Sequence, residues 1–216
     1  MLRKLLIVLA LALVSACSSS GGDAAALPSG PELMLKSAEA MKSVKSAAFS
    51  ISTEGKPKVQ VRKADGKLSA TGDAEGTLTI DVLGNLQEIS FSVVGDTVYF
   101  KGPTGGYQKM SKADLAQIYD PSLILNPSQG IAKLVGSAAD PRVEGEEDGA
   151  YKVAATLPAD VLAKLVPGIG QGVNGTVWID KATSRLTKAS LPLQDGTVIV
   201  TFSDYDAPVT VTAPTG

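Results

Sequence analysis

Apolar and polar residues alternate strictly along several short segments of this chain. In the segment 77–82, Leu78, Ile80 and Val82 alternate with polar residues. A period of two gives a strand one apolar and one polar face, which is typical of antiparallel sheets, whereas strands of parallel sheets are apolar throughout. The pattern therefore predicts an antiparallel sheet with one dry face. The same alternation places further apolar residues on that face: Ile89, Phe91 and Val93; Val98 and Phe100; and Val198, Val200 and Phe202.

Short turn signals separate many of these segments. Glycine beside aspartate or asparagine tolerates the positive φ that tight hairpin turns require. We expect a hairpin turn at each such dipeptide: Asp65-Gly66, Gly84-Asn85, Gly95-Asp96, Asp148-Gly149 and Asp195-Gly196.

Four other segments have the period of a helix. Near residues 31–45, Ser29 and Glu32 have the spacing of a capping box, and Pro31 suits the first helical position. Because strands come in groups with helices between the groups, the predicted class is α+β, with helices packed on the apolar face of the sheet. The other helices are expected to begin near residues 111, 126 and 158, and their apolar positions are Leu115 and Ile118; Ile131, Leu134 and Val135; and Val161, Leu162 and Leu165.

The first residues of the chain have the pattern of a secretory signal. Arg3 and Lys4 precede the apolar stretch 5–14, which is too short to cross a bilayer comfortably. Small residues then lead to Cys17, the single cysteine of the chain, and this arrangement resembles a bacterial lipobox. The resemblance implies acylation of the Cys17 thiol and cleavage before it. The alternative is an ordinary signal with a cysteine there by chance.

These features predict the domain organisation. Residues 1–16 would be a lipoprotein signal peptide, 17–30 a lipidated flexible linker and 31–216 a single domain. Two or more lipid chains hold a protein stably on a membrane. We therefore expect the protein on the extracytoplasmic face of the cell membrane, anchored through Cys17.

Composition excludes most catalytic chemistry. The chain has no histidine, which removes serine or cysteine triads, imidazole zinc sites and histidine pH switches. Glu144, Glu146, Glu147 and Asp148 cluster at an expected turn, where charge usually means a solvated loop, and they lack EF-hand spacing. We therefore predict no metal site, no cofactor and no enzymatic activity. A two-carboxylate hydrolase stays as the last-ranked alternative, although no pair of acids is singled out.

The balance of charge and apolar residues narrows the choice of ligand. A net charge of −2, without basic residues clustered among aromatics, predicts no nucleic-acid binding. The chain is 44% hydrophobic but only 5% aromatic. A curved sheet lined with small aliphatic residues could leave room for an acyl chain, whose burial contributes roughly 0.8 kcal/mol per methylene. A close-packed core is the alternative, and composition does not decide between them.

Several segments, taken in order, resemble a known family. Residues 126–135 resemble the "D-P-x-x-G-hydrophobic" helix of the mycobacterial LppX/LprA/LprF/LprG lipoproteins, with Asn126 in place of the aspartate. Residues 157–168 are similar to the next helix of that family, and 175–180 to the strand after its glycine-rich loop. Residues 186–191, 195–196 and 205–209 continue the pattern, with Tyr205 where the family has tryptophan.

The resemblance implies a half-open antiparallel sheet wrapped on helices, a half-barrel that encloses a large apolar cavity. It also implies carriage of acylated lipids or lipoglycans across the periplasm-like space and, for LprG-like members, work beside a membrane efflux transporter. The alternative is a scaffolding lipoprotein with a packed core that binds a protein partner. On the carrier hypothesis, the predicted cavity lining is Leu78, Ile80, Val82, Ile89, Phe91, Val93, Val98 and Phe100 from strands, with Ile118, Ile131, Leu134 and Val135 as a roof.

Overall fold

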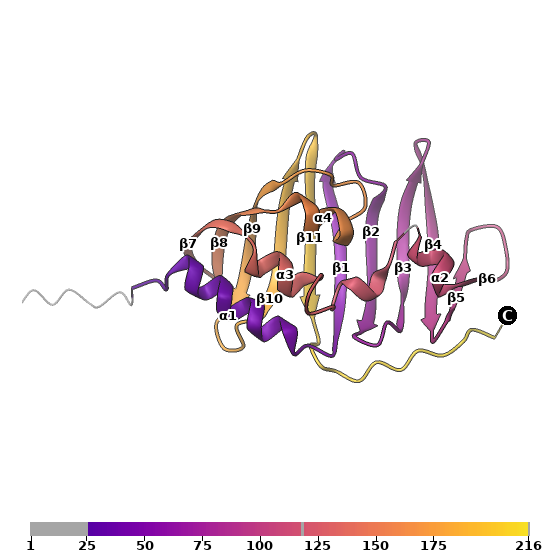
Figure 1. The fold of residues 1–216 in the computed structure, drawn as a ribbon. Helices are drawn as coiled ribbons and strands as arrows, with labels where there is room; N and C mark the ends of the chain where they lie inside the picture. The colour runs from indigo at the N-terminus through magenta and orange to yellow at the C-terminus, as the bar shows by residue number, and fades with distance from the viewer. Residues whose placement is uncertain (1–25, 118, 216) are drawn as a thin grey trace, which may run out of the picture.

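One antiparallel sheet runs through the molecule from edge to edge (Figure 1). The structure is a computed structural model that describes residues 26–117 and 119–215. Within them the sheet has eleven strands, in the spatial order β6-β5-β4-β3-β2-β1-β11-β10-β9-β8-β7. The strands are β1 (Ser46–Gly55), β2 (Val61–Ser69), β3 (Ala74–Val82), β4 (Asn85–Val94), β5 (Thr97–Lys101), β6 (Gln108–Ser111), β7 (Ala139–Glu147), β8 (Ala150–Leu157), β9 (Val173–Asp180), β10 (Leu186–Leu193) and β11 (Gly196–Ser203).

This strand order explains why the sheet is covered on one face. Consecutive strands pair with one another except β6 and β7, and at the centre of the sheet β1 pairs with β11. The two edge strands, β6 and β7, are consecutive in the chain, so residues 112–138 must cross the whole width of the sheet to join them. That crossing segment carries helices over one face, and the sheet does not close into a barrel.

The helices pack on that same face (Figure 1). Helix α1 packs against α3 and β7, α3 packs against α4, and α4 packs against the short 3₁₀ helix η1, while α2 lies beside β5 and β6. No helix of the described residues is long and apolar enough to cross a membrane. The helices are α1 (Gly30–Lys42), α2 (Lys112–Ala116), η1 (Pro121–Leu123), α3 (Ile131–Gly136) and α4 (Ala159–Leu165).

The predicted sheet class, its dry face and the four helical segments are confirmed, and several local details of the prediction are wrong. Asp65-Gly66 is not a turn but the middle of β2. Gly66 stands opposite Gly76, and a Cβ on it would lie 2.5 Å from the carbonyl oxygen of Glu75, so this glycine permits a close approach of strands. The capping box is also absent, since the Ser29 side chain makes no cap hydrogen bond.

The third helix begins later than the sequence suggests. Residues 126–129 form a turn in which Asn126 Oδ1 accepts hydrogen bonds from the N–H groups of Ser128 and Gln129, at 2.9 and 3.1 Å. Helix α3 starts only at Ile131. Asparagine side chains favour such local bonds over helix propagation, which accounts for the delay.

The densest packing lies between the helices and strands β8 to β11. Val153, Leu157 and Ile179 are fully buried there, as is Leu162 of α4. Burial of each such side chain contributes about 1.5–3 kcal/mol. This half of the molecule is close-packed, whereas in the half built on β2 to β5 full burial on the dry face is confined to one end of the strands and Leu78, Ile89, Phe91 and Phe100 are half-buried.

Candidate functional site

All four phenylalanines of the chain lie in one row across the dry face of the sheet. Directly paired residues of neighbouring strands share a face, so the strand register alone establishes the row. It runs from β11 to β5 through two glycines, in the order Phe202, Phe49, Gly66, Gly76, Phe91 and Phe100.

The two glycines leave a gap in the middle of this aromatic row. A Cβ on Gly76 would lie 2.2 Å from the carbonyl oxygen of Asp65, so no side chain fits at the present spacing of β2 and β3. Glycines of this kind let a sheet bend sharply. The Phe49 ring lies close to Gly66, since its Cζ is 3.0 Å from the site of a Cβ there. The Phe49 ring therefore covers Gly66, and the gap between that ring and Phe91 is left at Gly76.

Burial on this face decreases from one end of the strands to the other. Beside the β4–β5 turn, Ala74, Val93 and Val98 are only 1–3% exposed. The phenylalanine row comes next and is half-buried, as is the following pair of Leu78 and Ile89. At the β3–β4 turn, Val82 is 45% exposed. The apolar face is thus closed at one end and open at the other.

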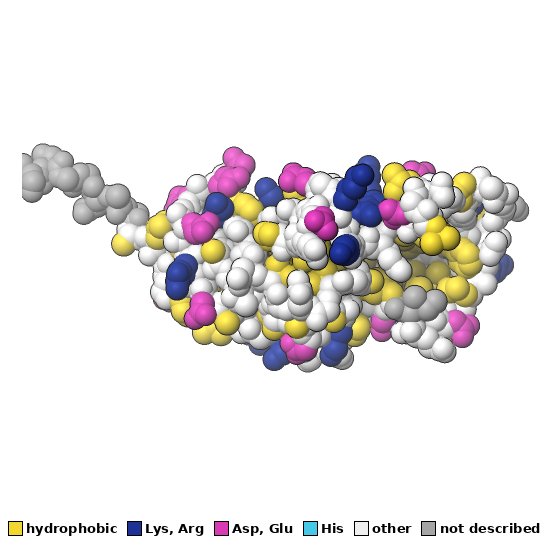
Figure 2. All heavy atoms as spheres, turned by 90° about the horizontal axis from the view of Figure 1, so that it is seen from above, with side chains coloured by type: hydrophobic (Ala, Val, Ile, Leu, Met, Phe, Trp, Pro, Cys, Tyr) yellow, Lys and Arg dark blue, Asp and Glu magenta, His cyan; other side chains and the backbone are white. Residues whose placement is uncertain are grey.

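The space-filling view shows the open end. Figure 2 looks along the strands from the end of the sheet at which the β3–β4 turn lies. Yellow side chains are visible there in a hollow over the half of the molecule built on β2 to β6. Apolar side chains from the crossing segment and β6 pack toward the same region, among them Met110, Leu115 and Ile124. The sheet forms one wall of the hollow and the crossing segment forms the other.

A half-buried tyrosine holds the crossing segment in place. Tyr119 follows α2, and its hydroxyl donates to the carbonyl oxygen of Leu165 in α4, at 3.2 Å. Burial raises the pKa of the Tyr119 phenol far above its ordinary value, and the neighbouring Asp120 carboxylate raises it further. The phenol therefore stays protonated and remains a donor throughout the physiological range.

The predicted lining residues fall into three groups. Five are packed in the core, namely Val93, Val98, Ile131, Leu134 and Val135. Five are half-buried on the dry face of β3 to β5, namely Leu78, Ile80, Ile89, Phe91 and Phe100. Val82 is exposed at the open end, while Ile118 and Cys17 lie outside the described residues.

The part of the site that sequence reasoning missed is the part that depends on strand order. Phe49 and Phe202 are far from β3 to β5 in sequence, and only the β1–β11 pairing brings them into the row. The alternation in residues 198–202 predicts a strand, but it does not indicate with which strand that segment pairs. The glycine at position 66 is visible in the sequence, but glycine is typical both of turns and of closely packed strands.

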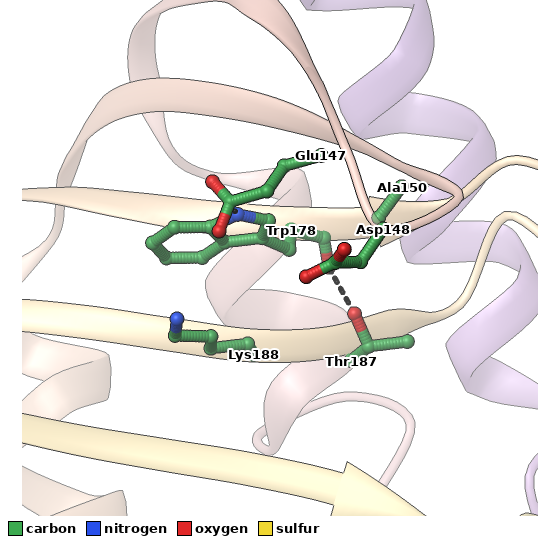
Figure 3. Close-up of a pocket in the computed structure, with 6 residues that line it drawn as sticks. All are labelled: Glu147, Asp148, Ala150, Trp178, Thr187 and Lys188. Atoms are coloured by element: carbon green, nitrogen blue, oxygen red, sulfur yellow. Dashed lines mark hydrogen bonds between the residues drawn. The ribbon is translucent and has the colours of Figure 1, made fainter.

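Two open pockets lie outside the hollow. One, of about 270 Å³, is lined by Lys58, residues 168–171, Leu193 and Gln194. The other is a shallow hollow of about 110 Å³ on the opposite face of the sheet, near the β7–β8 turn (Figure 3). Neither contains a predicted lining residue.

The shallow pocket is built around the single tryptophan of the chain. Trp178 Nε1 donates to Glu147 Oε2 at 3.2 Å, and Lys188 Nζ lies 4.3 Å from the ring centre (Figure 3). The hydroxyl of Thr187 donates to the Trp178 carbonyl oxygen at 3.2 Å. Because the carboxylate and the ammonium group are both occupied by the indole, this arrangement joins β7 to β10 rather than offering free chemistry.

The acidic cluster of residues 144–148 is likewise engaged in pairs. Glu144 accepts from Lys152 at 3.2 Å and Glu146 from Lys181 at 2.6 Å. The Glu146 carboxylate raises the pKa of Lys181. Among the described residues, no group of three or more acidic or cysteine side chains is arranged to hold a metal ion.

The comparisons with known proteins all indicate the same family. Residues 30–211 match the model of the LppX_LprAFG lipoprotein family. The chain is 32% identical to the lipoarabinomannan carrier protein LprG of Mycolicibacterium smegmatis, over 95% of this chain and 92% of that protein. It is 26% identical to the putative diacylated glycolipid transporter LprF of Mycobacterium bovis, over 92% and 83%.

Solved structures agree with the sequence matches. The crystal structure of LprF from Mycobacterium bovis superimposes with a TM-score of 0.78 at 25% identity, covering 88% of this chain and all of that one. The crystal structure of LppX from Mycobacterium tuberculosis gives a TM-score of 0.63 at 25% identity, covering 85% of this chain and all of that one.

Proposed function

Since the chain belongs to the LppX/LprA/LprF/LprG lipoprotein family, we propose that it binds acylated lipids or glycolipids on the open apolar face and carries them across the cell envelope. The observation that carries this proposal is the half-buried aromatic row, which crosses the dry face between its packed end and its open end. Relatives named as a lipoarabinomannan carrier and a glycolipid transporter support the same ligand class.

The physical reason is the cost of moving acyl chains through water. Burying the methylenes of a sixteen-carbon chain contributes on the order of 12 kcal/mol, at roughly 0.8 kcal/mol each. A protein that covers the chains while leaving the polar head group in water removes most of that barrier. It needs apolar surface and no catalyst, so the proposal is a carrier without enzymatic activity.

The site of binding follows from burial. Leu78, Ile80, Ile89, Phe91 and Phe100 keep part of their surface free on the dry face. We assign acyl-chain contact to these five residues. The absence of a side chain at Gly76 gives a chain a place to lie against the sheet between the Phe49 ring, which covers Gly66, and Phe91.

The proposal includes a lipid anchor. Acylation of Cys17 after removal of residues 1–16 would tether the domain 31–216 through the linker 17–30, on the extracytoplasmic face of the cell membrane. A membrane efflux transporter is the protein partner that the family resemblance implies. Metabolic labelling with a palmitate analogue tests the anchor, and Cys17→Ser is expected to abolish the label.

The decisive experiment is recovery of bound lipid. Protein carrying Cys17→Ser, purified without detergent, is extracted with organic solvent and the extract is examined by mass spectrometry. We expect stoichiometric acylated lipid or glycolipid with the parent protein, and loss of it with Phe100→Asp. Tyr99→Asp is the matched control, because Tyr99 is the next residue and faces the opposite side of β5. An extract without lipid, together with no uptake of added envelope glycolipid, would refute the proposal.

A further inference from the structure

The most exposed large apolar side chain of the described residues stands at the tip of the β3–β4 hairpin. Leu83 is 97% exposed, and beside it Leu86 is 64% and Val82 45% exposed. Val82 lies on the dry face of the sheet and Leu86 on the other, so the tip is apolar on both sides and at its apex. Isolated exposed apolar side chains are common on proteins, but three large ones on one hairpin tip are not.

The backbone of the tip is held in a conformation that does not suit leucine. Leu83 and Gly84 both have positive φ, +53° and +85°, and form the two-residue turn between Val82 and Asn85. This is the turn in which Asn-Gly is the preferred pair, because a β-carbon makes positive φ costly for most residues. Folding alone would favour asparagine at position 83. Leucine there therefore has another use.

The tip is also firmly positioned. Asp81 Oδ1 accepts from the Gly84 N–H at 2.8 Å, and Asp81 Oδ2 accepts from Arg62 at 2.8 Å. These bonds lower the pKa of Asp81, with the Arg62 bond as the larger cause. The hairpin stands beyond its neighbour β5, whose last residue, Lys101, pairs with Ser90.

The tip is continuous with the proposed lipid site. Val82, Ile80 and Leu78 lie in file on the dry face of β3 and lead to Gly76 in the phenylalanine row. At about 3.3 Å per residue, the track from Leu83 to Gly76 is about 23 Å long. Figure 2, which looks along the strands from this end of the sheet, shows yellow side chains both at the rim and in the hollow behind it. The nearby β5–β6 loop adds Tyr107, 36% exposed, with Lys101 Nζ 5.7 Å from its ring centre.

We propose that the β3–β4 tip inserts into the surface of a lipid bilayer, so that acyl chains pass between the membrane and the hollow along β3. A narrow apolar protrusion suits insertion into a bilayer, whereas a stable protein interface requires about 800 Å² on each partner. Tyrosine beside lysine is a pairing that favours the level of the lipid head groups. The inference rests on the proposed lipid carriage and adds where the membrane is met.

A pair of turn glycines gives a direct test. Gly84 and Gly95 lie at opposite ends of β4, both have positive φ, and a Cβ on either would meet nothing within 4 Å. Each is replaced by cysteine in the full, acylated protein and labelled with an environment-sensitive fluorophore. The proteins are then reconstituted on phosphatidylcholine vesicles that contain phosphatidylglycerol. We expect a blue shift, and quenching by brominated acyl chains, at position 84 and neither at 95. A probe at 84 that stays in water, or equal quenching at both positions, overturns the inference.

A second measurement separates docking from lipid binding. Leu83→Asn combined with Leu86→Ser is expected to slow uptake of fluorescent lipid from the same vesicles at least threefold, while uptake of detergent-dispersed lipid is unchanged. Leu35→Ser is the control, since Leu35 is 64% exposed on α1, away from the tip. Equal loss from both lipid sources would overturn the docking role. Insertion at position 84 without any lipid uptake would refute the carrier function and leave the docking inference standing.

Discussion

Phe100 and Val93 lie on the same face of adjacent strands, yet their surroundings differ. Val93 is 1% exposed in the packed end of the face, whereas Phe100 is half-buried beside Phe91. The alternation of the sequence assigned both to a cavity lining with equal weight. At the scale of single residues, partial exposure is what separates a side chain available to a ligand from one that holds the fold together.

This difference predicts opposite outcomes for the same substitution. Val93→Asp buries an unpaired carboxylate and should destabilise the fold by several kcal/mol, enough to prevent purification of folded protein. Phe100→Asp can keep its charge in water and should melt within a few degrees of the parent while losing most lipid binding. Circular dichroism melts and a fluorescent-lipid titration measure the two effects. A folded Phe100→Asp variant with unchanged binding would remove Phe100 from the site.

Asp206 gives a prediction on pH. Its Oδ1 accepts from the Lys45 N–H at 2.8 Å, and its Oδ2 pairs with Arg185. The bond from Lys45 is the larger cause and the pairing with Arg185 a further one, and together they lower the pKa of Asp206. A carboxyl group with a lowered folded-state pKa adds stability that is complete above its unfolded pKa, near 3.9, and is lost as the pH falls through the folded value.

Asp206→Asn should therefore lower the free energy of unfolding by up to about 1 kcal/mol at pH 7. The difference from the parent should shrink below about pH 4 and vanish once the parent carboxyl is protonated. Urea unfolding at several pH values measures it. A difference that is the same at pH 7 and in acid would show that the charge of Asp206 contributes nothing.

At the scale of elements, the crossing segment depends on one glycine. Gly130 precedes α3, and a Cβ there would lie 2.2 Å from the carbonyl oxygens of both Leu123 and Ile124. The Ile131 N–H also donates to the Ile124 oxygen at 3.0 Å. The glycine of the "D-P-x-x-G" motif thus lets the segment after η1 pack tightly against the start of α3.

Gly130→Ala should destabilise the protein by about 2–4 kcal/mol, because backbone rather than a flexible side chain must move. Gly172→Ala is the matched control, since its nearest contact would be an ordinary 3.4 Å, and it should change stability by less than about 0.5 kcal/mol. Chemical denaturation compares the two variants. Equal stability of both would mean that the segment after η1 shifts without cost.

Elements with a strong local signal could be predicted from the sequence. Alternation gave the dry faces of β3 to β5, and the turns at Gly95-Asp96 and Asp148-Gly149 occur as expected. The turns predicted at Gly84-Asn85 and Asp195-Gly196 each begin one residue earlier, so that Asn85 and Gly196 already pair as strand residues. The start of α3 could not be predicted from periodicity, because Asn126 bonds to the backbone of its own turn and the helix begins only after it. Asp65-Gly66 misled because glycine serves turns and close strand contacts equally.

At the scale of the whole molecule, what decides the site is the order of the strands. The pairing of β1 with β11 brings the two ends of the fold together and completes the phenylalanine row. The segment that crosses from β6 to β7 places helices over one face of the sheet. It leaves part of that face open in the half built on β2 to β5. Local periodicity indicates neither which strands pair nor how much of the sheet the helices cover. The hollow could therefore be expected only from the family resemblance.

An open, partly filled apolar face predicts how ligand affects global stability. A lipid that binds only the folded state at a hundred times its dissociation constant adds about 2.7 kcal/mol to the free energy of unfolding. For a domain of this size, about 2–4 °C of melting temperature accompanies each kcal/mol, so lipid should raise the melting temperature by about 5–10 °C. Calorimetry of delipidated protein with and without added glycolipid measures the shift. Phe100→Asp should remove most of it and Tyr99→Asp should not, because only Phe100 faces the hollow. A shift of equal size in both variants would place the lipid elsewhere, and the pocket beside residues 168–171 would be the next surface to test.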